Sequence, residues 1–287
     1  MKPTIALAVI GGSGLYSMRG LEGSEELNID TPFGKTSAPI IVGSLEGKRV
    51  AFLARHGIGH HLLPSEVPYC ANIYALKQIG AERVVSISAC GSLKDDFAPG
   101  HIVIPDQVFD FTKGRRRTFF GEGLVAHISV ADPFCPDLSQ VLESALEKTG
   151  ARTHRGGMFI TIEGPRFSTR AESNTFRSWG MSLIGMTTSP EVFLAKEAEL
   201  CYTVMAHVTD YDVWLQSEAP VTVEMVIKTL NNNTELAQEA IRLMVRDMKS
   251  TRDCDCDRSL ASALITQPDV IPAQTRQKLD LLITKYL

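Results

Sequence analysis

The stretch LCYTVMAHVTDYDVW, residues 200–214, combines an apolar run with two acidic residues that follow it directly. The run is short and consists of β-branched or other apolar residues with a lone Thr203, which predicts a buried strand. Asp210 and Asp212 therefore stand at the carboxyl end of a strand, where open α/β sheets bind their ligands. A carboxylate there can also cap the next turn. Other segments of the chain are needed to distinguish a capping role from a ligand-binding role.

Strand-like and helix-like segments alternate along the chain around this stretch. Strands are predicted at residues 5–10, 38–43, 49–54, 83–92, 101–106 and 158–162, and helices at 65–80, 136–150, 168–180, 189–200, 222–248 and 272–287. The first helix would have Ser65 as its N-cap, and the segment 222–248 is either one long helix or a broken pair. This alternation predicts a three-layer α/β/α domain with a mixed or mostly parallel central sheet. We expect one domain over residues 1–287, with 251–287 its least diagnostic part.

The composition excludes several classes of protein. The chain has 287 residues, of which 44% are hydrophobic and 22% charged, and its net charge of −4 gives no electrostatic case for nucleic acid or an anionic membrane. No stretch approaches the ~18 apolar residues of a membrane helix. The apolar run at the N-terminus has only about seven residues and no cleavage site follows it, so we interpret it as a strand rather than a signal peptide. A cytoplasmic protein is expected.

The six cysteines fall into two groups. Four stand singly in apolar or turn contexts and are interpreted as small core residues: Cys70, Cys90, Cys135 and Cys201. Cys254 and Cys256 form a C-x-C pair, for which free surface thiols are favoured over a small strained disulfide. Half a metal site is disfavoured, because no second half with ligand spacing appears in the sequence.

Four turns that follow predicted strands have the composition of anion sites. GGSGLY at 11–16 offers backbone N–H groups and the Ser13 hydroxyl, and LARHGIGHH brings Arg55, a forked cation suited to phosphate. SACGS at 88–92 presents hydroxyl and backbone donors, and TTSPE at 187–191 opens a helix, whose N-terminus attracts anions. Each turn alone could equally be a tight turn or a helix cap.

Competing interpretations of these segments are weaker. GGSGLY is not a dinucleotide fingerprint, because Ser17 replaces its last glycine and two further glycines interrupt the helix that should follow. His60 and His61 do not predict a metal site, since the neighbouring glycines break any helix that would align them. The basic run KGRRR at 113–117 is most simply a solvated loop; a lid or phosphate-attracting edge is the other interpretation.

Together the motifs GGSGL, TPFGKTS, ARHG, NIYALK, ACGSL, PGHIVIPDQ, EGPRFSTRAE, MTTSPEVFLAKE and TDYDVW resemble, in order and over about residues 5–250, the 5′-methylthioadenosine phosphorylases. These enzymes belong to the trimeric branch of the purine nucleoside phosphorylase family. The resemblance implies a purine nucleoside phosphorylase-like fold and phosphorolysis of 5′-methylthioadenosine to adenine and 5-methylthioribose 1-phosphate. It also implies a homotrimer or a dimer of trimers, with inorganic phosphate as co-substrate and without a metal or organic cofactor.

The resemblance assigns roles to matching positions. Phosphate would be surrounded by Ser13, Arg55, His56, Ser88, Ala89 and Thr187. The nucleoside would contact Phe167, Met186, Tyr211, Asp210, Asp212 and, from the neighbouring subunit, His127, while Ser168 and Val223 match positions linked to base and 5′-substituent preference. The stretch at 200–214 then acquires a function. Asp210 would protonate the purine at N7, and Asp212 would bind the 6-amino group and help to hold Asp210 protonated.

The physical chemistry of the carboxyl pair agrees with that assignment. A free Asp titrates near about 3.9 and is a poor acid at neutral pH, whereas burial beside a second carboxylate raises the apparent pKa of the pair. Two alternatives remain: a phosphorylase of 6-oxopurine nucleosides such as inosine, which Asp rather than Asn at position 210 disfavours, and a non-catalytic nucleotide-binding module.

Overall fold

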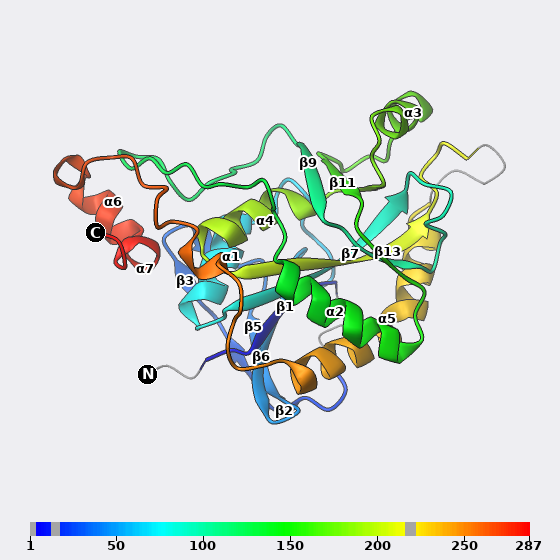
Figure 1. Ribbon diagram of the computed structural model, residues 1–287, viewed down its shortest axis with the longest axis horizontal. Helices are drawn as coiled ribbons and strands as arrows, with labels where there is room; N and C mark the ends of the chain where they lie inside the picture. The colour runs from blue at the N-terminus through cyan, green and yellow to red at the C-terminus, as the bar shows by residue number, and fades with distance from the viewer. Residues whose placement is uncertain (1–3, 13–17, 216–221) are drawn as a thin grey trace.

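The computed structural model describes residues 4–12, 18–215 and 222–287 (Figure 1). Its strands are β1 (Leu7–Gly11), β2 (Glu22–Leu27), β3 (Asp30–Thr31), β4 (Gly34–Lys35), β5 (Ile40–Leu45), β6 (Lys48–Ala54), β7 (Arg83–Ser92), β8 (Ile102–Ile104), β9 (Gln107–Phe111), β10 (Thr153–Arg155), β11 (Met158–Ile162), β12 (Leu183–Gly185) and β13 (Cys201–Asp210). Its helices are α1 (Tyr69–Gln78), α2 (Pro136–Thr149), α3 (Arg170–Ser178), α4 (Thr188–Glu197), α5 (Val223–Asp247), α6 (Ala273–Lys278) and α7 (Asp280–Ile283), with 3₁₀ turns η2 (Cys256–Arg258) and η3 (Pro268–Val270).

The central sheet is mixed, as the sequence predicts. Within the described ranges it has 11 strands, and its main path runs β10-β8-β13-β7-β1-β6-β5-β2. The four middle strands β13, β7, β1 and β6 are parallel, whereas β5 and β2 extend the sheet in antiparallel fashion. The ends of neighbouring parallel strands lie at one edge of a sheet, so the carboxyl ends of β1, β6, β7 and β13 meet there.

Helices cover both faces of the sheet, which is why the middle strands are buried along almost their whole length. Figure 1 shows α1 and α4 on one side of the sheet and α2 and α5 on the other. Alternate residues of β1 serve the two cores: Ala8 and Ile10 belong to the cluster with α1 and α4, and Leu7 and Val9 to the cluster with α2 and α5. The predicted three-layer α/β/α architecture is confirmed.

The helix ends differ from the prediction in two places. The first helix begins at Tyr69 and not near Ser65, because Pro68 disfavours helical geometry in the residue before it. The segment 272–287 forms α6 and α7 rather than one helix, with Leu279 between them buried in the core. The segment 222–248 forms the single helix α5, which settles the alternative left open by the sequence.

Several strands lack a sequence signal. β2 has the sequence EGSEEL and is almost entirely exposed, so no apolar face marks it. β10 and β12 have three residues each, too few for a periodic pattern. No helix in the described part of the chain has the length and apolarity needed to cross a membrane.

The cysteines depart from expectation. Cys256 is buried and Cys254 partly buried, so the predicted surface position of the C-x-C pair is wrong. Cys135 precedes α2 and Cys201 opens β13, and the sulfur atoms of these four cysteines all lie within 4.8 Å of one another. The fold therefore places two further sulfur atoms, those of Cys135 and Cys201, beside the C-x-C pair, which the spacing in the sequence did not reveal.

Candidate active site

Several of the predicted site residues lie at the edge where the parallel strands end. β7 and β13 run side by side, with Ser88 opposite Ala206 and Gly91 opposite Asp210. Arg55 follows β6, and its backbone N–H donates to the carbonyl of Gly11 at 3.2 Å. The sheet register thus brings together segments that are far apart in the sequence. Ser13 lies outside the described residues.

Arg55 is buried, and its guanidinium is already bound by protein groups. Nε and Nη2 donate to the two carboxylate oxygens of Glu191 at 2.8 and 3.1 Å, and further donors reach the carbonyl of Ile87 and the hydroxyl of Ser86. Burial opposes the charged form, but the charge of Glu191 and its hydrogen bond raise the pKa of Arg55 above its ordinary value. The fork that the sequence analysis predicts for phosphate therefore pairs with Glu191, and at most one N–H of Nη1 remains.

Ser88 and Thr187 form a pair of hydroxyls at this edge. Their oxygens lie 3.3 Å apart, and both side chains are nearly buried. Antiparallel pairing of β12 with the end of β7 produces this proximity, because it places the turn after β12 beside Ala89. The structure thus brings together three of the predicted phosphate residues: Ser88 and Ala89 from β7, and Thr187 from the N-cap of α4.

The start of α4 has an irregular backbone. Ser189 is extended inside the helix, with φ −101° and ψ 137°, so regular helical geometry begins at Pro190. The fixed φ of proline suits this first position. The N-terminal end of α4, with its positive dipole, therefore lies next to Thr187.

His56 is a neutral imidazole in the folded protein. Burial and the nearby charge of Arg55 lower its pKa to about 4. Its Nδ1 lies 2.9 Å from the carbonyl oxygen of Leu62, and its ring stacks on His60 with centroids 4.3 Å apart. Because Nδ1 faces a carbonyl, it carries the proton, and Nε2 is the acceptor.

Asp210 ends β13 and is buried, with an exposed fraction of 7%. Its Oδ2 accepts from the Thr209 hydroxyl at 2.6 Å, and its Oδ1 accepts from the backbone N–H of Asp212 at 2.8 Å. Burial, with a smaller contribution from Asp212, raises the pKa of Asp210 to about 6 against these hydrogen bonds. Such a carboxyl group can act as a proton donor near neutral pH.

Asp212 is also buried and has a left-handed backbone with φ 51°, a region that Asp tolerates better than most residues. Burial raises the pKa of Asp212, and the nearby hydroxyls of Ser173 and Ser168 offset part of the rise. Its Oδ2 and both hydroxyls make no protein hydrogen bond of normal geometry. The three groups therefore form a small buried polar cluster beside Asp210.

Gly91 allows this close arrangement. A Cβ atom at position 91 would lie 2.9 Å from Oδ1 of Asp210 and 3.0 Å from a methyl carbon of Ile184. Any side chain there would displace the carboxylate. Gly91, which lies near the end of β7 and not in a turn, therefore leaves room for the two acids, a role that the sequence did not suggest.

Arg115 is a site residue that the sequence analysis missed, since its run KGRRR resembled a solvated loop. Arg115 is buried, and its Nη1 donates to the carbonyls of Met186 and Ser189 at 2.6 and 2.8 Å. Its Nη2 donates to the carbonyl of Glu163 at 2.7 Å. One guanidinium thus holds together the loops after β11 and β12. No local pattern distinguishes it from Arg116 and Arg117.

The remaining predicted residues lie in open positions. Phe167 has an exposed fraction of 39% and Val223, the first residue of α5, of 61%. The ring of Tyr211 packs edge-on against Trp214 at 5.6 Å. His127 is exposed, and its backbone N–H donates to the carbonyl of Ala263. The chain by itself leaves these side chains accessible.

Comparisons with known proteins identify the family of this chain. Residues 6–246 match the family model of the phosphorylase superfamily. The S-methyl-5′-thioadenosine phosphorylase of Geobacter sulfurreducens is 51% identical over 282 residues, covering 98% of this chain and 99% of that protein, and the one of Koribacter versatilis is 50% identical over 280 residues, covering 98% and 96%.

Two solved structures extend the likeness to the fold. The crystal structure of a methylthioadenosine phosphorylase from an antarctic soil metagenomic library has a TM-score of 0.94 at 44% identity, covering 98% of this chain and 100% of that one. The Schistosoma mansoni methylthioadenosine phosphorylase in complex with adenine has a TM-score of 0.83 at 31% identity, covering 98% of each chain. The chain belongs to the phosphorylase superfamily, in its methylthioadenosine phosphorylase branch.

Proposed function

We propose that the protein catalyses the phosphorolysis of 5′-methylthioadenosine to adenine and 5-methylthioribose 1-phosphate. The observation that carries the proposal is Asp210, a carboxyl group with a pKa raised to about 6 at the ligand-binding edge of the sheet. The relatives that match nearly the whole chain bear the name of this activity. Breaking the glycosidic bond needs a proton donor for the purine, and this group fits that need.

Phosphate is the nucleophile, and several groups are available to hold it beneath C1′. The hydroxyls of Ser88 and Thr187 offer donors 3.3 Å apart, and the N-terminus of α4 adds a positive dipole end. Arg55 contributes its remaining N–H, although Glu191 neutralises most of its charge. Fixing the anion in line with the breaking bond supplies much of the rate.

The proton for N7 comes from Asp210. With a pKa of about 6, about a tenth of these groups carry a proton at neutral pH, compared with about a thousandth for a free Asp. Asp212 accepts from the 6-amino group through Oδ2, which lacks a hydrogen bond from the protein. Asp210 thus donates the proton to N7, while the neighbouring Asp212 binds the 6-amino group of the same base.

The reaction balances without any further reactant. The phosphate oxygen bonds to C1′, the C1′–N9 electron pair goes to the purine, and Asp210 gives its proton to N7. The sugar phosphate carries one proton fewer than the phosphate that attacked, and that proton restores Asp210. No electrons are exchanged with a third component, so phosphate serves as co-substrate and no organic cofactor is needed. We further propose a homotrimer, in which His127 of one subunit reaches the 5′ end of the nucleoside in its neighbour.

Steady-state kinetics test the proposal. kcat/KM would be measured for methylthioadenosine, adenosine, inosine and methylthioinosine, each with and without phosphate. We expect phosphate-dependent release of adenine from methylthioadenosine and little turnover of the two 6-oxopurines. Preferred cleavage of inosine would support the 6-oxopurine alternative, and binding without turnover would indicate a non-catalytic nucleotide-binding module.

A further inference from the structure

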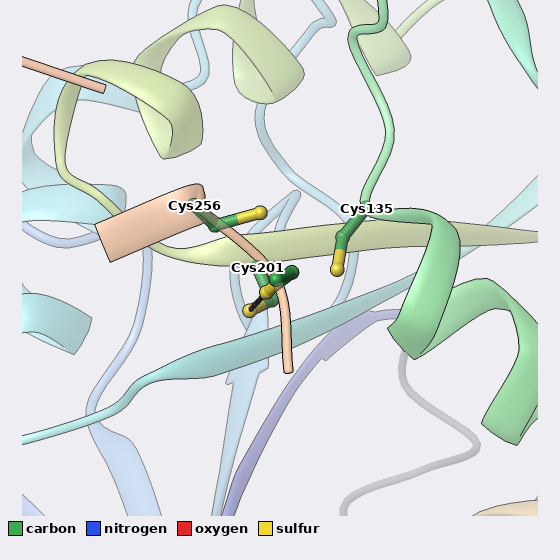
Figure 2. A group of neighbouring side chains, drawn as sticks. Cys135, Cys201 and Cys256 are labelled. Carbon is green, nitrogen blue, oxygen red and sulfur yellow. Dashed lines mark hydrogen bonds between the residues drawn. The ribbon is translucent and has the colours of Figure 1, made fainter. Parts of the chain in front are cut away.

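Four cysteines gather at the end of β13 opposite to the active site. Cys135 caps the N-terminus of α2, Cys201 is the first residue of β13, and Cys254 and Cys256 come from the segment after α5. Figure 2 shows Cys135, Cys201 and Cys256 with their sulfur atoms turned toward one another. All four sulfur atoms lie within 4.8 Å of one another, and those of Cys201 and Cys254 are 3.3 Å apart.

This arrangement matches the ligand set of a structural metal. In a tetrahedral Cys₄ zinc site each Zn–S bond is about 2.3 Å, which places the sulfur atoms about 3.8 Å from one another. The distance of 3.3 Å between the sulfur atoms of Cys201 and Cys254 and the upper limit of 4.8 Å for all pairs lie on either side of that value. We propose that Cys135, Cys201, Cys254 and Cys256 bind one structural Zn²⁺ ion.

The surroundings suit a charged thiolate site. Zinc with four thiolates carries a net charge of −2, which needs positive partners. The backbone N–H of Leu138 donates to Sγ of Cys135 at 3.4 Å, and the N-terminus of α2 adds a positive dipole end. The guanidinium of Arg252 interacts electrostatically with Cys201. Hydrogen bonds of this kind around the ligands hold metal sites in shape.

The alternative to a metal site is that the same cysteines form disulfide bonds. A bond needs two sulfur atoms at about 2.05 Å, and a bridge within Cys254-Asp255-Cys256 closes a very small strained loop. A metal ion uses all four sulfur atoms at once without bringing any pair to bonding distance. The partial burial of the cluster and its four-fold convergence therefore favour the metal.

The ion would stabilise the fold and take no part in the chemistry. Cys201 and Asp210 stand at the two ends of the ten-residue β13, about 30 Å apart. The ion joins the segment after α5 to the first residue of β13 and to α2. That segment continues to Ala263, whose carbonyl accepts from the backbone of His127.

Metal analysis of the full-length protein tests the proposal. The protein is purified under reducing conditions without chelators, and zinc is measured by plasma mass spectrometry together with the thiol count after denaturation. We expect close to one Zn²⁺ per chain and a tetrahedral thiolate absorption spectrum when Co²⁺ replaces zinc. Chelation should lower Tm, and added Zn²⁺ should restore it.

Single variants locate the ion. Cys254→Ser and Cys256→Ser should each weaken zinc binding by more than about tenfold, since loss of an outer partner alone commonly costs that much. Cys70→Ser, a buried cysteine of α1 outside the cluster, is the matched control and should keep the zinc. If the variants fail to fold, chelation of the wild-type protein still reports on the site.

Two results would overturn the proposal. Protein without zinc that shows all six thiols would mean that the cluster binds no metal, and protein with only two thiols would mean that the four cysteines form two disulfides. Zinc that remains in both Cys254→Ser and Cys256→Ser would place the ion elsewhere. None of these results depends on which nucleoside the enzyme cleaves.

Discussion

Arg55 and Glu191 form a buried two-point ion pair, with Nε–Oε2 and Nη2–Oε1 distances of 2.8 and 3.1 Å and side chains that are 3% and 1% exposed. The two residues are 136 positions apart in the sequence. Their pairing joins the end of β6 to the start of α4, the two elements that flank the proposed phosphate position. The pair is therefore both a structural link and a part of the site.

Arg55→Ala should damage both stability and phosphate binding. Loss of the guanidinium leaves the buried carboxylate of Glu191 without its ion-pair partner and with the Tyr202 hydroxyl, at 2.7 Å, as a neutral donor. Loss of one partner of a buried ion pair typically costs about 3–5 kcal/mol of folding free energy. Loss of the remaining donor should weaken phosphate by about 1.5–3 kcal/mol. Tm and the KM for phosphate measure the two effects separately. Glu191→Gln is the matched variant: it should lower Tm but raise the KM for phosphate much less. A KM for phosphate within about twofold of wild type in Arg55→Ala would contradict the binding role.

Asp210 should set the choice between 6-amino and 6-oxo purines. A protonated carboxyl donates to N7 and accepts from the 6-amino group, whereas a 6-oxopurine presents acceptors at both places. Asp210→Asn can donate but cannot protonate, so kcat/KM for methylthioadenosine should fall by ~10²-fold or more. Methylthioinosine turnover should fall far less or rise. The decisive measurement is the ratio of the two kcat/KM values, and an unchanged ratio would show that Asp210 does not distinguish the bases.

The same carboxyl should make stability depend on pH. Burial raises the pKa of Asp210 to about 6 in the folded protein, while an unfolded Asp titrates near about 3.9. Between these values the folded chain holds a proton that the unfolded chain has released, so the free energy of unfolding falls as pH rises through this window. Relative to wild type, Asp210→Asn should therefore gain up to roughly 2–3 kcal/mol between about pH 4 and pH 7. Denaturant unfolding at both pH values measures this, with the exposed Asp269→Asn as control. Equal changes in both variants would argue against burial as the cause.

Gly91→Ala should reduce kcat more than it reduces stability. The new Cβ would lie 2.9 Å from Oδ1 of Asp210 and so push the acid away from the base. A displacement on the order of 1 Å can cost about 10²-fold in rate. Gly114→Ala, where a Cβ meets nothing within 4 Å, is the control and should behave like wild type. A wild-type kcat in Gly91→Ala would show that the position of Asp210 is not critical.

His127 should act on the nucleoside of the neighbouring subunit. Its side chain is exposed in the single chain, as expected of a group that reaches across a boundary. His127→Ala and Asp210→Ala chains should each be nearly inactive, and mixed trimers should regain activity at the sites that receive both intact residues. The measurement is activity after subunit exchange, followed by mass spectrometry of the mixed oligomers. Exchange without recovery would exclude a shared site.

Much of the fold was predictable because its signals are local. The apolar run of β13 and the capped amphipathic pattern of α2 determine their elements within a few residues. β2 could not be predicted, since all its residues face solvent to some degree and only pairing with β5 makes it a strand. Pro68 is a local signal that the helix prediction did not use: it disfavours helical geometry in the residue before it, so α1 begins only at Tyr69.

The sequence by itself determined the layered α/β/α fold, the phosphorylase motifs and the two acids at the end of β13. Hydrophobic periodicity and motif order are properties of neighbouring residues, so no coordinates were needed to recognise them. Only the tertiary structure decided that Arg55 pairs with Glu191, that Arg115 is buried against the loop carbonyls, and that four separate cysteines converge. A buried polar or sulfur group needs a partner nearby in space, and tertiary packing determines which residue that is. The number of residues between two groups in the sequence does not give the distance between them in the folded chain.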